Sequence, residues 1–279
     1  MVVAAAQRAS PRRDMNARLL DSLPIWLVFL LTVMLIVLSV EIGYRVAVHR
    51  ARKSQKEREA PIDSMVGPTL GLLAFMLAFT FGMASSRYDA RKQFVVDEAN
   101  AIRTADLRAQ LIAEPEQSAI RALLREYVDV RLEGILSPRD LAQGIQRSEQ
   151  LHKMLWSHIA SRGTEIAPGD RAVLATAFLD IINIHTKRLN AVTQNRISGA
   201  VWVALYSLAV LAMGMLGYRA GLSGRRSGIA IVVLALAFSA VLQLITDLDR
   251  PQQGLVEVSQ QTMKDLQGNL RSSTSGQAP

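Results

Sequence analysis

MVGPTLGLLAFMLAFTFGMASS, residues 65–86, is a run of 22 residues without a charged side chain. An α-helix rises 1.5 Å per residue, so a helix of this length covers the roughly 30 Å hydrocarbon core of a bilayer. Three more uncharged stretches of 18 to 22 residues occupy 23–40, 197–218 and 227–246. The rest of a 279-residue chain is too short to cover four such helices in a soluble fold. The sequence therefore predicts an all-α, polytopic membrane protein with four transmembrane helices and the lipid bilayer as its first partner.

The composition agrees with this prediction and excludes several kinds of site. Half of the residues are hydrophobic, but only 5% are aromatic. The net charge is +8, from 32 Lys and Arg against 24 Asp and Glu. Because so much of the chain is apolar, we attribute this excess to lipid headgroups and loop charges, not to nucleic acid. The chain has no cysteine, which excludes disulfides, thiolate nucleophiles and cysteine-based zinc sites.

Between the two pairs of spans the hydrophobic pattern becomes that of amphipathic helices. We expect the second span to continue outward to Ala105, a break at Glu114-Pro115, and three further helices with apolar faces at 120–132, 141–159 and 173–192. The last helix is expected to run on into the third span. The predicted organisation begins with a basic tail at 1–22 and the first pair of spans, with its basic connection, at 23–86. A helical, water-facing middle domain follows at 87–196, and then the second pair of spans at 197–246. The C-terminal segment covers 247–279 and is expected to be disordered from about 271.

Four spans place both termini and the middle domain on one side of the membrane. We expect a multi-pass membrane protein. Cations are dense in the connections 45–58 and 219–226, which favours cytoplasmic connections by the positive-inside rule. Arginines and lysines also flank the spans on the opposite side, so the sidedness of the middle domain stays open.

The second span carries two different faces. Small residues recur at steps of three and four and form a stripe that suits close helix packing, either inside one chain or between copies. This small-residue stripe consists of Gly67, Gly71, Ala74, Ala78 and Gly82. A bulky ridge beside it suits contact with lipid, or the constriction of a pore that gates by dewetting in a ring of subunits. The bulky ridge consists of Leu72, Phe75, Phe79 and Met83.

The fourth span closes on a short charged motif. Asp247, Asp249 and Arg250 precede Pro251, which stops the helix because it has no N–H to donate. Two carboxylates are too few for a calcium or magnesium shell. We therefore interpret the motif as an interfacial cap or salt bridge.

Polar groups also follow the second span. Glu98 and Asn100 stand with Asp97 at helical offsets from Arg87 and Arg91, and a solvated network of ion pairs is expected there.

No pattern in the sequence predicts catalysis, a metal site or a cofactor. The four histidines, His49, His152, His158 and His185, lack the spacing of a metal-binding motif, and His185 falls on the apolar face of its helix. There is no phosphate-binding glycine loop, nucleophile elbow or basic groove with interleaved aromatics. We predict that the protein is not an enzyme and that it binds neither a cofactor nor nucleic acid.

Four segments carry a resemblance to a known family. They are GLLAFMLAFTFGMASSRYDARKQ at 71–93, DEANAIRTA at 97–105, REYVDVR at 125–131 and DLDRPQQG at 247–254. Together they resemble the bacterial bestrophin-like domain family, which is distantly similar to bestrophins. The residues that match its motifs are Arg87, Tyr88, Arg91, Glu98, Asn100, Asp247, Asp249, Arg250 and Pro251.

This resemblance implies a function as well as a fold. Bestrophins are pentameric anion channels whose second membrane helix supplies a hydrophobic neck and continues into a helical cytosolic domain. By analogy the bulky ridge would be the neck, the protein a homo-oligomer in a bacterial inner membrane, and chloride or other small anions the permeant species. The alternative is a non-conducting membrane scaffold whose middle domain binds a protein partner.

Overall fold

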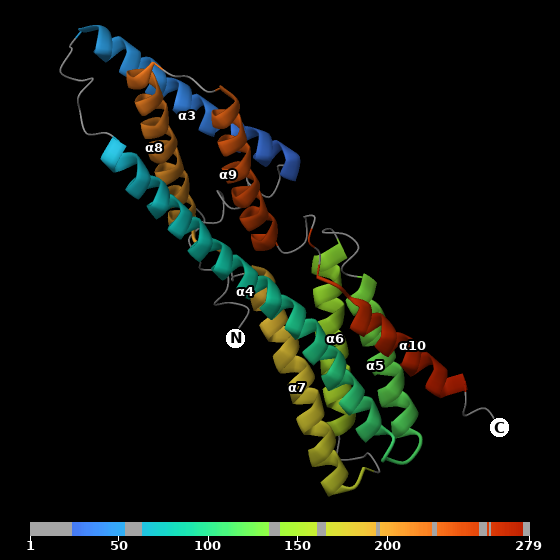
Figure 1. Ribbon diagram of the computed structural model, residues 1–279. Coiled ribbons are helices and arrows are strands. Elements are labelled where there is room, and N and C mark those ends of the chain that lie inside the picture. The colour runs from blue at the N-terminus through green and yellow to red at the C-terminus, as the bar shows by residue number, and fades with distance from the viewer. Residues whose placement is uncertain are drawn as a thin grey trace. The chain divides into compact units, whose positions relative to one another are not determined.

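The computed structural model describes residues 24–53, 63–133, 140–160, 166–193, 196–224, 228–250, 256 and 258–275. Every regular element in these residues is an α-helix (Figure 1). In chain order the helices are α3 (Ile25–Lys53), α4 (Asp63–Ala109), α5 (Glu116–Glu133), α6 (Asp140–Ala160), α7 (Pro168–Thr193), α8 (Gly199–Ser223), α9 (Gly228–Asp249) and α10 (Gln261–Ser275). The all-α prediction is confirmed.

Four of these helices, α3, α4, α8 and α9, are long and apolar enough to cross a membrane, as predicted. Two of them extend well past their uncharged stretches. α3 continues beyond Val40 to Lys53, where Arg45 pairs with Glu41 one turn earlier at 2.8 Å. α4 continues beyond Ser86 to Ala109, as the apolar positions Val95, Ile102 and Ala105 require if they are to be buried.

The described residues divide into two compact units. The first unit holds the residues up to Ser86 and those from Arg196 to Val256. The second unit holds the residues from Arg87 to Thr193 together with 258–275. Helix α4 contributes residues to both.

In the first unit, α3 packs closely against α8 (Figure 1). A methyl group at Gly43 would lie 2.0 Å from the carbonyl oxygen of Gly214, and one at Gly217 would lie 2.0 Å from that of Val40. The Ser39 hydroxyl donates a hydrogen bond of 2.5 Å to the carbonyl of Val210. Small residues bring the two backbones together here, as they do at many membrane helix interfaces.

The second unit has one hydrophobic core, made by the end of α4 with α5, α6, α7 and α10. The apolar faces predicted for α5 and α6 are confirmed, since Ile120, Leu124, Val128 and Leu155 are all buried. Val173 was expected on the buried face of α7, and this expectation is wrong: its neighbour Leu174 is buried, and Val173 is 43% exposed.

Two further expectations about the chain are wrong. α7 does not run on into the third span, because residues 196–198 are not helical and α8 begins only at Gly199. The tail from 271 is not wholly without structure, because α10 extends to Ser275. This helix forms because Met263, Leu266 and Leu270, at helical spacing, bury their side chains in the core of the second unit.

Candidate functional site

The membrane segment of α4 is packed on one face and exposed on the other. Leu73, Leu77, Thr80 and Ala84 are buried within the chain. On the same helix, the Thr69 hydroxyl donates to the Met215 sulfur of α8 at 3.7 Å. Among the described residues, the packing of one chain therefore uses this side of the helix.

The bulky ridge lies on the exposed side of α4. Leu72 is 52% exposed, Phe75 65% and Phe79 57%, while Met83 is half-buried. These side chains are available to lipid or to another copy of the chain.

The small-residue stripe is also exposed. Gly67, Gly71, Ala74, Ala78 and Gly82 all face outward. A methyl group added at any of the three glycines would meet no heavy atom within 4 Å. Close glycine packing among the described residues is found between α3 and α8 instead.

The motif that closes the fourth span binds backbone amides. The Asp249 carboxylate accepts a hydrogen bond of 3.0 Å from the N–H of Ile197, and the Asp247 carboxylate accepts one of 3.0 Å from the N–H of Val256. Both aspartates and Arg250 are buried. This arrangement agrees with a structural cap; Pro251 lies outside the described residues. Among the described residues, no group of three or more potential ligands is placed to hold a metal ion.

The other motif residues lie on the continuation of α4. Arg91 is buried, Arg87 and Tyr88 are half-buried, and Asn100 is exposed. The remaining one, Glu98, is the centre of a buried polar cluster in the second unit.

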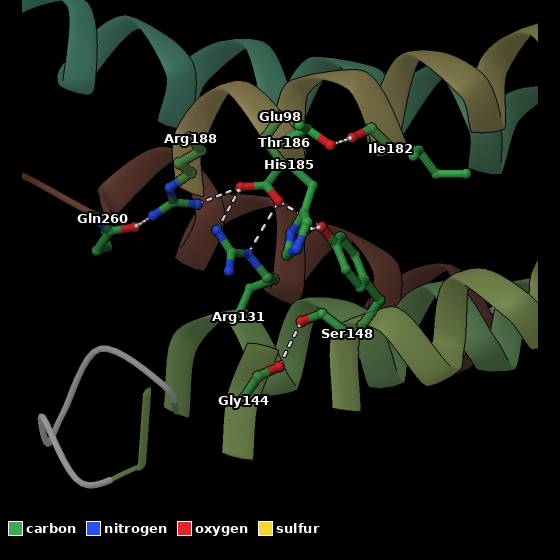
Figure 2. Close-up of polar contacts among 10 residues, drawn as sticks. Glu98, Arg131, Gly144, Ser148, Ile182, His185, Thr186, Arg188 and Gln260 are labelled. Atoms are coloured by element: carbon green, nitrogen blue, oxygen red, sulfur yellow. Dashed lines mark hydrogen bonds and ion pairs between the residues drawn. The ribbon is translucent and has the colours of Figure 1, made fainter. Parts of the chain in front are cut away.

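The expectation of a solvated network at Glu98 is wrong, because the side chain of Glu98 is 0% exposed. Figure 2 shows its carboxylate between two arginines from other helices. Arg131 of α5 lies 3.0 Å from Oε1 and donates a second contact of 3.3 Å to Oε2. Arg188 of α7 donates to Oε2, and the Tyr127 hydroxyl donates to Oε1 at 2.6 Å. One carboxylate thus holds α4, α5 and α7 together.

The two arginines keep this carboxylate ionised. Burial by itself raises the pKa of Glu98, but Arg131, Arg188 and the Tyr127 hydrogen bond outweigh it and lower the pKa from 4.5 to about 2. Burial by itself lowers the pKa of Arg131. Glu98 beside it outweighs burial and raises that pKa above its ordinary value. Burial next to Glu98 raises the pKa of Tyr127 well above 10, so the hydroxyl remains a donor.

Two histidines complete the cluster, which we call the Glu98 cluster. Nδ1 of His185 lies 3.2 Å from the Tyr127 oxygen, and the His152 ring packs 5.0 Å from the Tyr127 ring, centroid to centroid. Burial lowers the pKa of His152 to about 4 and that of His185 to about 3, so both rings are neutral at pH 7.

The sequence contained one signal for the Glu98 cluster. Glu98 follows Val95 by three residues and precedes Ile102 by four, so it falls on the stripe of α4 whose apolar members enter the core. A carboxylate on such a stripe requires buried partners. The identity of those partners, on helices distant in sequence, was not predictable from spacing.

Comparison with known proteins identifies the fold. The Bestrophin-like domain family matches residues 33–263 of the chain. A crystal structure of a bacterial bestrophin homologue from Klebsiella pneumoniae is 14% identical, with a TM-score of 0.66 over 88% of this chain and 99% of that one. A leucine-to-threonine variant of the Klebsiella pneumoniae homologue is 13% identical, with a TM-score of 0.66 over 90% of this chain and 98% of that one. No curated protein matches the sequence.

Proposed function

Because the chain belongs to the bestrophin-like domain family, we propose that it is a homo-oligomeric membrane channel for small anions such as chloride, with the bulky ridge of α4 as its hydrophobic neck. The observation that carries this proposal is the exposure of Phe75 and Phe79 opposite a fully packed face of the same helix. In a ring of copies these side chains would point toward a common axis. A neck of this kind requires several chains, since one helix encloses no pore.

The chemistry of the ridge suits weakly hydrated anions. An apolar constriction offers no ligands to replace lost water, so ions that hold their hydration shell loosely pass most easily, and dewetting closes it. Arg87 follows the ridge on the same helix, and its charge would raise the local concentration of anions.

Phe75→Ala and Phe79→Ala are expected to raise halide efflux from reconstituted vesicles several-fold, because each widens and wets the neck. The measurement is halide release from vesicles of matched protein content. Leu211→Ala is the matched control, since Leu211 of α8 is 63% exposed, as the phenylalanines are, but lies on another span. Equal efflux from all three variants and the wild type, or no efflux from any of them, would contradict the neck and favour the non-conducting scaffold.

The small-residue stripe supports the oligomer in this proposal. Gly71→Leu and Gly82→Leu are expected to shift the protein toward smaller species, because the added side chains hold neighbouring backbones apart. Native mass spectrometry or light scattering in detergent measures the shift. Ala204→Leu on the exposed side of α8 is the control and should leave the mass unchanged. If both glycine variants keep the wild-type mass, the stripe does not lie between subunits.

A further inference from the structure

His152 and His185 are buried together in the core of the second unit. They are 9% and 3% exposed, and their ring centroids lie 4.9 Å apart with one ring edge-on to the other. The two side chains come from α6 and α7, and each also faces the ring of Tyr127 on α5. A change in the charge of either imidazole therefore alters contacts among α5, α6 and α7.

The charges around this pair are unbalanced. The titratable and charged groups of the cluster are Glu98 from α4, Tyr127 and Arg131 from α5, His152 from α6, and His185 and Arg188 from α7. α10 contributes the apolar residues Met263 and Leu266 to the same core. With both histidines neutral, two guanidinium groups share one carboxylate, and the cluster already carries an excess positive charge.

The carboxylate has no capacity left for another cation. Oε1 of Glu98 accepts from Tyr127 and faces Arg131, and Oε2 accepts from both Arg131 and Arg188. Because the Tyr127 hydroxyl gives its proton to Glu98, its oxygen can only accept from His185, which must carry its proton on Nδ1. A second proton on His185 would go to Nε2, which is buried and has no hydrogen-bond partner. Nε2 of His152 is also buried and has no hydrogen-bond partner.

From this geometry we infer that His152 and His185 form an acid-sensitive switch in the second unit: a proton on either ring adds a third cation to the Glu98 cluster and loosens the packing of α4, α5, α6 and α7. The inference concerns the packing of the second unit and holds whether or not the protein conducts ions.

The pH range follows from the pKa values. Burial is the main cause that lowers the pKa of both rings, to about 4 for His152 and about 3 for His185, from 6.5 in an unfolded chain. The unfolded chain therefore binds protons first as the pH falls. The stability that the neutral rings provide is complete above pH 6.5 and is lost progressively from pH 6.5 down to those values. The stability that Glu98 provides is lost only as the pH falls below 4.5, so a change between pH 7.5 and pH 5.5 reports the two histidines and not Glu98.

Hydrogen exchange of the full-length protein in detergent tests the switch. After correction for intrinsic exchange, peptides from 94–109, 116–133 and 168–193 should open about 100-fold more readily at pH 5.5 than at pH 7.5, since each histidine contributes about tenfold. His185→Gln keeps a donor for Tyr127, and His152→Phe keeps a ring for it to pack on. Each should reduce the change to about tenfold, and the double variant should abolish it. His158→Gln, at the partly exposed pair with Glu116, should keep the full change.

Two results would overturn the switch: equal protection of the wild type at both pH values, or a double variant that keeps the 100-fold change. If the variants do not fold at pH 7.5, exchange at the imidazole C2 position gives the pKa of each ring in the unaltered protein. Values below 5 for both rings support the switch, and values near 6.5 contradict it.

Discussion

Glu98→Gln is expected to destabilise the second unit by about 3–5 kcal/mol, because it leaves two buried guanidinium groups without their counter-charge. Arg131 and Arg188 are both nearly buried, and among the described residues each forms its ion pair with Glu98. The amide of glutamine keeps the size of the side chain and can still accept from Tyr127. The loss therefore reports the missing charge and not a cavity.

Thermal unfolding in detergent, followed by the loss of helical circular dichroism, measures this effect. At about 2–4 °C per kcal/mol, the midpoint should fall by roughly 10 °C. Asp97→Asn is the matched control, because Asp97 is the adjacent carboxylate on α4 and its hydrogen bond is an exposed one to Gln93 within the same helix. A midpoint for Glu98→Gln that matches Asp97→Asn would show that the ion pairs add no net stability.

Gly43→Ala and Gly217→Ala are expected to destabilise the first unit by about 3 kcal/mol or more, because each added methyl group collides with backbone and not with a flexible side chain. The nearest atom in both cases is a carbonyl oxygen 2.0 Å from the new Cβ. Either α3 moves away from α8, or the helices bend. Both outcomes disrupt the close contact between α3 and α8.

The same thermal assay, with size-exclusion chromatography to detect aggregation, measures the loss. Gly228→Ala is the control, since nothing lies within 4 Å of a methyl group at that position. Gly214→Ala should fall between the two, because its nearest neighbour is the Ser39 hydroxyl at 3.3 Å, which can rotate away. Equal midpoints for Gly43→Ala and Gly228→Ala would contradict this prediction. They would show that the seam, the contact of α3 with α8 at Gly43 and Gly217, accepts an added methyl group without loss of stability.

The candidate site was predictable from sequence to different extents on the two units. The bulky ridge could be identified because Leu72, Phe75 and Phe79 repeat at helical spacing in an uncharged stretch, and the structure places them on one exposed face. The Glu98 cluster was misjudged, because neighbours at helical offsets on α4 supplied charges that appeared sufficient to pair Glu98. Its real partners, Arg131 and Arg188, lie on α5 and α7.

The sequence by itself determined the four spans, the all-α class and most of the buried faces of the second unit. These follow from short-range rules, because the hydrocarbon thickness fixes the length of a span and the helical period fixes which residues share a face. Only the tertiary structure decided which glycines approach another backbone and which charges are buried. The stripe at Gly67 and Gly71 and the seam at Gly43 and Gly217 have the same local chemistry, and what separates them is the presence of a neighbouring helix. Because a buried contact joins residues far apart in the chain, no local pattern can specify it.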